Sequence, residues 1–340
     1  MFDEIPEWYR NQTADNEEEG WKYTQGDRAA RRPPELLTRD HVARCIVREI
    51  KEGRGSPHNG VFLDISWIKN KLPGAAEHIK KKLPSMYHQF KKLADIDITK
   101  EAMEVGPTTH YMMGGIRVDA DTQMSTVAGL FAAGEAAAGL HGANRLGGNS
   151  LSDLLVFGKR AGEFAAKFAK STGSGGENAQ AIIIDEQEIA TFAKRVLEPF
   201  ERTGGDNPFQ VQYDLQEMMQ DLVGIVRKEE ELLKAIEELK KLCDRSNKVR
   251  VIGNREYNNG WHTALDLQNL LTVSEAITKA AIERKESRGA HFREDYPEKD
   301  EQSGKFNLII FKGEDGHMQV KKEPLREIRN DLKQIIDEMK

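Results

Sequence analysis

The 340-residue sequence predicts a multidomain protein that mixes helices and strands, of the α+β or α/β class. Three observations support that prediction. Composition shifts after Thr99, and residues 105–165 are rich in Gly and Ala and poor in charge. Residues 182–286 carry apolar side chains three and four positions apart, which is the spacing of helices packed on a core. Residues 306–322 form a pattern of two short strands joined by a glycine-bounded turn.

The elements ahead of the glycine-rich stretch are short. The first forty residues are charged and contain Pro33-Pro34, so we expect an irregular, solvated segment there. The regular elements expected next are a helix over 39–51, a strand over 61–64, one helix or a pair of helices over 67–83, and another helix over 84–94. Asp40 is expected to cap the first of these helices and Gly53 to end it.

The density of glycine in residues 105–165 predicts loops wrapped around a ligand, because glycine permits positive φ and close backbone approach. Short strands are expected at 116–118 and 129–132, followed by a helix over 151–170. One face of that helix is built from small residues and leucines, so we expect it to pack very closely on a neighbour. The later elements expected are helices within 182–200, 215–245 and 265–286, and strands over 306–312 and 318–322.

Charge and cysteine content exclude several classes of protein. The chain has 50 basic and 56 acidic side chains, a formal net charge of −6, which argues against a general nucleic-acid binder. Cys45 and Cys243 are far apart, which excludes a disulfide scaffold, a cysteine-rich zinc site and an iron–sulfur cluster within this chain. This cysteine usage fits a reducing compartment. The histidines have no metal-ligand spacing, and no apolar run is long enough to span a bilayer directly.

Three segments carry residues suited to chemistry, although no standard nucleotide-binding or nucleophile motif is present. His110 stands just before a Gly-Gly pair. Glu135 follows a predicted short strand, where a carboxylate can accept hydrogen bonds from sugar-like hydroxyls. Arg145 lies among small residues without an obvious acidic partner, so its guanidinium favours an anionic ligand such as a carboxylate. The helix that opens at Ser150 favours negative charge against its start.

Four motifs, in order along the chain, resemble the flavoprotein subunit of succinate dehydrogenase and fumarate reductase: HYMMGG, GLFAAGE, HGANRLGGNSLSDLLVFG and ERKESRGAHFREDYP. The earlier run LTRDHVAR resembles the family's arginine-bearing helix start. The resemblance implies the remainder of a capping domain (1–104), the C-terminal part of an FAD-binding domain (105–170), a linker (171–176), a helical domain (177–290) and a small β-containing C-terminal domain (291–340). The family's N-terminal half, with its G-x-G-x-x-G motif, is unmatched, so we expect the C-terminal portion of such a subunit.

The resemblance implies a flavoenzyme that transfers a hydride between succinate or fumarate and FAD. In that family's scheme, Arg39 is the acid/base that passes a proton to or from the dicarboxylate, and His110 and Arg145 bind the substrate carboxylates. No metal site is implied.

The resemblance also implies cofactor contacts and partners. Glu135 would hold the ribityl part of FAD, and Ser150 and Leu151 would lie under the isoalloxazine, with Asn149 also in the cofactor-binding set. The implied partners are an iron–sulfur subunit and, through it, membrane anchor subunits. The implied location is the cytoplasmic, inner face of the membrane, reached only through those partners.

Two other functions remain open from the sequence. One is an L-aspartate oxidase-like flavoenzyme, which shares the arginine–histidine site. The other is a non-catalytic, truncated chain that docks an iron–sulfur subunit. Two histidines also keep alternative roles: His141 either contacts flavin or braces its loop, and His291 either closes the site structurally or takes part in the chemistry.

Overall fold

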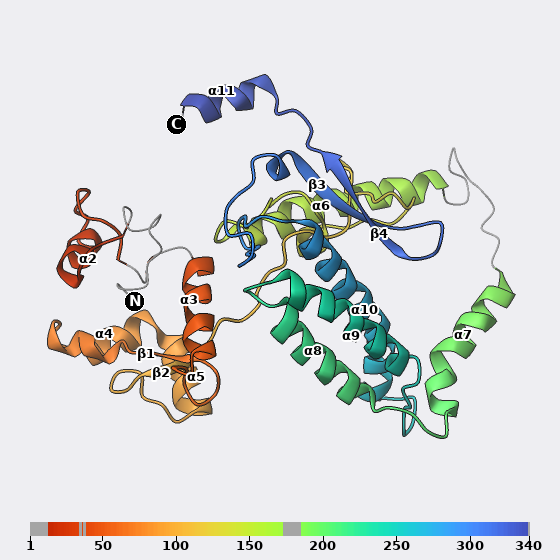
Figure 1. Cartoon of the computed structure of the whole chain (residues 1–340), viewed down its shortest axis with the longest axis horizontal. Helices are drawn as coiled ribbons and strands as arrows, with labels where there is room; N and C mark the ends of the chain where they lie inside the picture. The colour runs from red at the N-terminus through yellow and green to blue at the C-terminus, as the bar shows by residue number, and fades with distance from the viewer. Residues whose placement is uncertain (1–12, 34–35, 37–38, 173–184, 339–340) are drawn as a thin grey trace. The chain divides into compact units, whose positions relative to one another are not determined.

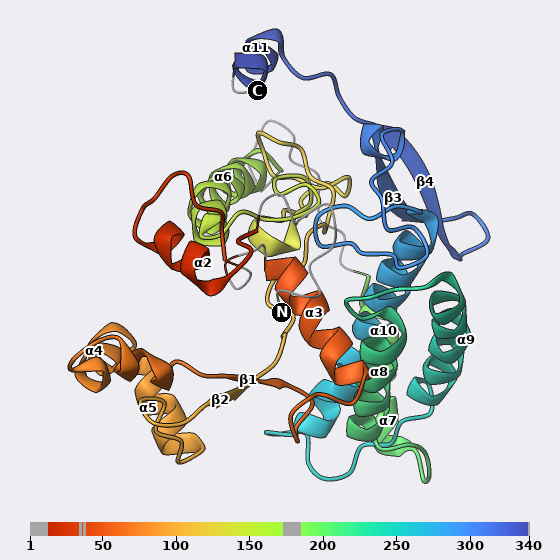
Figure 2. The same cartoon turned by 60° about the vertical axis from the view of Figure 1, so that its left-hand side comes forward.

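The computed structural model describes residues 13–33, 36, 39–172 and 185–338. The chain divides into two compact units, one ending at His110 and the other beginning at Tyr111. Figure 1 and Figure 2 show the elements of each unit.

The first unit is built from short elements around a small apolar core. In chain order they are α2 (Glu17–Thr24), α3 (Arg39–Lys51), β1 (Val61–Leu63), the 3-10 turn η3 (Ser66–Asn70), α4 (Ala75–Lys82), α5 (Pro84–Leu93) and β2 (Met103–Val105). Strands β1 and β2 pair antiparallel. Ile79, Ile98 and Met103 are buried together, and Tyr87 and Phe90 of α5 pack against them. The strand pair and α4–α5 therefore share one core.

One expectation for this unit needs correction. Residues 17–24 form helix α2 instead of irregular chain, because the side chain of Asn16 accepts a hydrogen bond from the N–H of Glu19 at 2.9 Å and caps the helix. Of the two alternatives over 67–83, the structure has the pair: η3 and α4 are separate, and Gly74 adopts a φ of 75° ahead of α4. The helix over 39–51 and the strand β1 are confirmed. Residues 1–12 of the expected irregular segment lie outside the described residues.

The second unit contains most of the helix. Its elements are η4 (Gly134–Ala136), α6 (Asn149–Thr172), α7 (Glu186–Glu201), α8 (Pro208–Val223), α9 (Glu229–Ser246), α10 (Asn259–Glu283), η5 (Ser303–Lys305), β3 (Phe306–Lys312), β4 (Met318–Pro324) and α11 (Asn330–Glu338). Strands β3 and β4 form the expected antiparallel hairpin, with Ile309 opposite Lys321. The described chain is thus a mainly helical protein with two small sheets.

Helices α8, α9 and α10 pack side by side as a bundle, and the β3–β4 hairpin contacts α10 (Figure 1). Leu215, Leu239 and Leu267 are among the buried residues at the centre of the bundle. The apolar zone expected over 215–245 is two helices, because the chain leaves the helix at Gly224 and begins again at Glu229.

The glycine-rich chain between Tyr111 and α6 consists of loops. The strands expected at 116–118 and 129–132 are only single bridges, such as Ile116 with Ala137. The bridge between Ile116 and Ala137 depends on Gly115. Its φ is 135°, and a Cβ there would overlap the backbone of Ala136, so only glycine lets these two segments approach. Within the described residues, this stretch has loop geometry with turns in place of a sheet.

Helix α6 does not pack as closely as its small-residue face predicts. Near its C-terminal end Phe168 packs edge-on against Phe131, and near its start Leu154 contacts Gly134. Leu151 and Leu155, however, are exposed, and a Cβ at Gly158 would meet no atom within 4 Å. The described residues cover only a part of this face and leave most of its leucines exposed.

Candidate active site

Arg145 is the centre of the glycine-rich loops. Its guanidinium carbon lies 4.5 Å from the centroid of the Tyr111 ring, stacked over the aromatic face. One Nη1–H donates to the carbonyl oxygen of Leu146 at 3.2 Å, while the buried Nε has no hydrogen-bond partner in the described structure. Among the described residues, no Asp or Glu forms an ion pair with this guanidinium. A half-buried cation with an unused donor suits a bidentate anion such as a carboxylate.

The buried carboxylate of Asp153, on α6, holds the Tyr111 ring on which Arg145 stacks. Asp153 Oδ2 lies 3.1 Å from His141 Nε2 and accepts a hydrogen bond from the Tyr111 hydroxyl at 3.3 Å. The Tyr111 and His141 rings meet edge to face at 5.3 Å. Burial, followed by the Asp153 charge, raises the pKa of Tyr111. Tyr111 therefore remains a neutral donor, and Arg145 stacks on a ring that α6 holds in place.

Glu135 lies on η4 and connects two of the loops. Its Oε1 accepts a hydrogen bond from the N–H of Met112 at 2.9 Å. The described residues provide no hydrogen bond to its other oxygen, Oε2, and the side chain is exposed. A carboxylate held by one oxygen, with the other open to solvent, can accept a hydrogen bond from a ligand hydroxyl.

The start of α6 provides a second ligand-binding feature. The 24-residue helix begins at Asn149, whose N–H donates to the carbonyl oxygen of Leu146 at 3.2 Å. The N–H groups that follow in the first turn, beginning with that of Ser150, have no partner within the helix. Leu151 stands beside them and is 67% exposed. Donors without a partner in the helix, next to an exposed apolar side chain, fit a flat aromatic group with a polar edge. These residues therefore fit a flavin, together with the open Oε2 of Glu135.

A loop from the C-terminal part of the chain, residues 288–291, is hydrogen-bonded to the loop that contains Arg145. The N–H of Ala290 donates to the carbonyl oxygen of Ala143 at 3.0 Å. Next to it, the half-buried His291 lies between two arginines: its Nδ1 is 2.9 Å from Arg227 Nη1, and its Nε2 is 3.0 Å from the carbonyl oxygen of Arg284. The motif that contains His291 therefore contacts the candidate site through a backbone hydrogen bond, that of Ala290 to Ala143.

Two of the predicted site residues belong to the first unit. Arg39 is the exposed first residue of α3 and has no ion pair within the described residues, whereas the neighbouring Asp40 pairs with Arg44 at 3.0 Å. His110 is the last residue of that unit and is exposed. The structure brings Glu135, Arg145, Asn149, Ser150 and Leu151 into the second unit.

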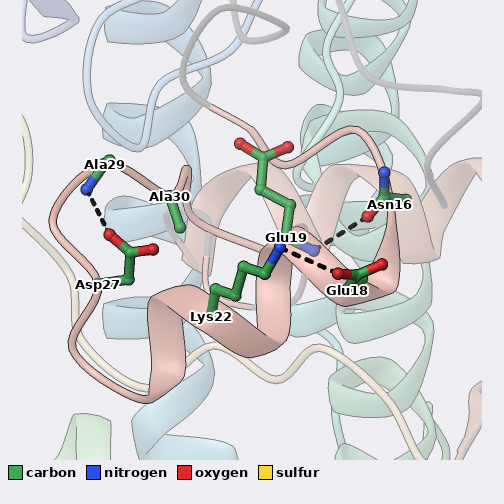
Figure 3. Close-up of a pocket in the computed structure, with 7 residues that line it drawn as sticks. All are labelled: Asn16, Glu18, Glu19, Lys22, Asp27, Ala29 and Ala30. Atoms are coloured by element: carbon green, nitrogen blue, oxygen red, sulfur yellow. Dashed lines mark hydrogen bonds and ion pairs between the residues drawn. The ribbon is translucent and has the colours of Figure 1, made fainter.

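A shallow hollow in the first unit is a weaker candidate (Figure 3). Asn16, Glu18, Glu19, Lys22 and Asp27 line it, and these polar groups are already hydrogen-bonded to one another or to nearby backbone. Because these polar groups already bond one another, an open hollow of this kind offers a ligand few free hydrogen-bonding groups. In the described part of the chain, no group of three or more His, Cys, Asp or Glu could hold a metal ion. No described helix is long and apolar enough to cross a membrane.

Sequence reasoning missed Asp153 and underrated Tyr111. The sequence gives a usable signal for Asp153, since it is the lone acidic residue among the leucines at the start of α6. A charge inside an apolar helical run needs a buried partner. Tyr111 reads as a packing residue in the sequence, and only its position beneath Arg145 reveals its role.

Two family profiles match the chain. One, described as the FAD binding domain, covers residues 12–151, and the other, described as fumarate reductase flavoprotein C-term, covers residues 212–334. Together they take in the glycine-rich loops, the bundle and the C-terminal hairpin.

Individual proteins give the same result. The succinate dehydrogenase flavoprotein subunit of Coxiella burnetii is 36% identical over 300 residues, covering 84% of this chain and 48% of that protein. The fumarate reductase flavoprotein subunit of Escherichia coli is 34% identical over 289 residues, covering 83% and 46%. The structure of Mycobacterium smegmatis Sdh1 in complex with UQ1 aligns with a TM-score of 0.78 at 48% identity, covering 90% and 50%. The chain spans about half the length of the curated relatives it matches.

Proposed function

The chain belongs to the family of succinate dehydrogenase and fumarate reductase flavoprotein subunits, which are FAD-dependent oxidoreductases, and we propose that it supplies the dicarboxylate-binding and flavin-facing part of such an enzyme. The proposed reaction is hydride transfer between succinate or fumarate and FAD. The observation that carries it is the Arg145 guanidinium, half-buried over Tyr111 with a buried, unused Nε.

Arg145 is the proposed anchor for one substrate carboxylate. A guanidinium stays charged at every physiological pH and offers two parallel N–H donors to a planar anion. The ring of Tyr111, held by Asp153, limits the rotation of the guanidinium, so less side-chain entropy is lost on binding. His110 is proposed as a second carboxylate ligand.

Arg39 is the proposed proton donor and acceptor. An arginine releases its proton reluctantly, so it needs surrounding basic groups that relay the proton. Its position at the first turn of α3, exposed and without an ion pair among the described residues, leaves the guanidinium available to a substrate. The role itself comes from the family resemblance of the LTRDHVAR run.

The cofactor contacts are proposed for four residues of the second unit. When bound, FAD accepts or supplies the hydride. The first-turn N–H groups around Asn149 and Ser150 would stabilise negative charge at the edge of the ring. Leu151 would cover the face of the ring with an apolar surface, and Glu135 would accept a hydrogen bond from a ribityl hydroxyl through Oε2.

The proposed partners follow the same assignment. An iron–sulfur subunit would take the electrons onward, and membrane anchor subunits would hold the assembly at the inner face of the membrane. The domain order proposed is the remainder of a capping domain, the end of the FAD-binding domain, the helical domain and the small C-terminal domain.

Two other functions compete with this proposal. An L-aspartate oxidase-like flavoenzyme would use the same arginine and histidine, and only the substrate separates it. A non-catalytic chain that docks an iron–sulfur subunit would bind no flavin. The same experiment distinguishes all three.

The test uses the full chain incubated with FAD and freed of unbound cofactor. We expect a flavin absorbance band that succinate bleaches in the absence of oxygen, and a spectral shift on titration with malonate, a dicarboxylate that cannot be oxidised in this way. Arg145→Gln should weaken malonate binding at least about 30-fold, because it removes one charged partner of a desolvated pair. Arg160→Gln, an exposed arginine further along α6, is the matched control and should change nothing.

The outcomes separate the candidates. Bleaching by L-aspartate instead of succinate would favour the oxidase. A chain that folds but retains no flavin would favour the docking protein. Equal malonate affinity in wild type and Arg145→Gln would remove Arg145 from the site. Arg39→Gln should abolish bleaching by succinate and leave flavin binding intact.

A further inference from the structure

His291 is half-buried, and both of its ring nitrogens are hydrogen-bonded. Arg227 Nη1 can only donate, so His291 Nδ1 accepts at 2.9 Å. The carbonyl oxygen of Arg284 can only accept, so Nε2–H donates to it at 3.0 Å. The two contacts require a neutral ring with its proton on Nε2. In this form the ring links Arg227, in the α8–α9 connection, to Arg284 at the end of α10.

Arg227 is itself held rigidly. Its Nε donates to the carbonyl oxygens of Val223 and Gly224 at 2.9 and 3.0 Å, at the C-terminal end of α8. Its backbone N–H donates to Phe292, and its carbonyl accepts from Glu294. Burial, with the nearby Arg293 charge, lowers the pKa of Arg227. The residue therefore joins the bundle to the segment that follows His291 by backbone and side chain together.

The segment just before His291 reaches the candidate site. Arg288 and His291 exchange backbone hydrogen bonds at 2.9 and 3.1 Å, which closes a tight turn. The N–H of Ala290, inside the turn, donates to Ala143, two residues before Arg145. Gly289 has a φ of 60°, and a Cβ there would overlap the Ala143 carbonyl, so the turn fits against the Arg145 loop only with glycine.

The charges around His291 favour its neutral form. Burial lowers its pKa to about 4, and the neighbouring Arg227, Arg293 and Arg284 charges act in the same direction. The hydrogen bond to the Arg284 carbonyl opposes them. Near neutral pH, the ring therefore keeps the acceptor that Arg227 requires.

We propose that His291 is a positioning residue for the Arg145 loop: its neutral ring ties the 288–291 turn to the helical bundle, and the turn holds Ala143 through Ala290. The effect on ligand binding rests on the proposed function of Arg145 as the carboxylate ligand. The effect on the loop itself does not.

The test compares two variants of the full chain. His291→Gln retains an acceptor for Arg227 and a donor for the Arg284 carbonyl, whereas His291→Leu has a similar volume and neither group. We expect faster amide hydrogen exchange over residues 140–148 in His291→Leu and wild-type exchange in His291→Gln. With FAD bound, malonate should bind about 10-fold more weakly to His291→Leu and within 2-fold of wild type to His291→Gln.

Two further variants keep the test decisive. Leu232→Ala destabilises the bundle without touching the turn, so it should leave exchange over 140–148 unchanged. If His291→Leu fails to fold, Gly289→Ala disturbs the same contact from the turn side and should loosen 140–148 with His291 intact. Unchanged exchange in the folded variant, or a failure of His291→Gln to preserve it, would overturn the proposal. A wild-type chain that binds no malonate would overturn only the carboxylate role of Arg145.

Discussion

The α8–α10 bundle and the glycine-rich loops with α6 contain similar apolar residues but differ in how far these residues are buried. In the bundle, Leu232 and Leu267 are completely buried by neighbouring helices of the same chain. On α6, Leu155 is 76% exposed, and in the loops the Arg145 Nε has no partner among the described residues. The centre of the bundle is filled by its own side chains, whereas the loop region leaves the leucines of α6 exposed and the Arg145 guanidinium without an ion pair among the described residues.

This difference shows where structure and function divide within the second unit. A buried core contributes stability and tolerates little change, while exposed leucines beside unpaired donors cost stability unless something covers them. The exposed groups of the loop region converge at the start of α6, where the proposed flavin and carboxylate would bind. The His291 turn connects the two regions, because it holds a backbone atom of the Arg145 loop from the bundle side.

The largest expected effect is on stability, and it tests the comparison directly. Leu267→Ala should lower the free energy of unfolding by about 2–5 kcal/mol, because it removes a fully buried side chain and leaves a cavity in the bundle. Leu155→Ala makes the same chemical change on α6 and should shift it by less than about 0.5 kcal/mol. Urea unfolding followed by circular dichroism measures both. Similar losses in the two variants would mean that the α6 face is covered in solution.

The next effect concerns acid stability and should arise on the bundle side. The pKa of His291 is lowered to about 4 from its usual value near 6.5, so the unfolded chain binds this proton first. Its contribution is therefore fully present above about pH 6.5 and is lost as pH falls toward 4, by at most about 3 kcal/mol. The lowered pKa of Asp295, about 2 through its pairing with Arg293, gives a separate loss only below about pH 4.

His291→Gln isolates that contribution, because an amide cannot take up the proton. Its stability between pH 7 and pH 4 should fall less steeply than that of the wild type. Chemical denaturation at a series of pH values measures the slope. Parallel curves for the two proteins would show that His291 is not kept neutral by the fold.

The regular elements could be predicted from the sequence wherever spacing alone decides them. The helix over 39–51 and the strands around the 313–316 turn follow from apolar periodicity and a glycine-bounded reversal. Helix α2 could not, since its charged sequence looks solvated and only the Asn16 cap reveals it. The loop at 116–118 looks like a strand locally, yet it forms only isolated bridges, at Ile116 with Ala137 and at Val118 with Ser125, and no ladder.

The site could be predicted as a set of chemical types but not as an arrangement. A guanidinium without an acidic neighbour in sequence marks Arg145, and the structure leaves it without an ion pair in the described chain. The support beneath it, from Tyr111 and Asp153, joins residues 42 positions apart, and the turn at His291 lies much further along. Such contacts depend on tertiary packing, which no local pattern encodes.

The smallest effect tests whether the loop region waits for a ligand. Glu135→Gln keeps an amide oxygen that can accept the Met112 N–H, so the loop and the stability of the chain should stay within about 0.5 kcal/mol of wild type. It removes the charged Oε2, so FAD should bind about 10-fold more weakly, the cost of one charge-assisted hydrogen bond. Flavin fluorescence titration measures this, with Glu163→Gln on the exposed side of α6 as the control. Because the Met112 contact survives the change, a loss of FAD affinity would assign the open oxygen to the ligand, and unchanged affinity would leave Glu135 with only its structural role between the loops.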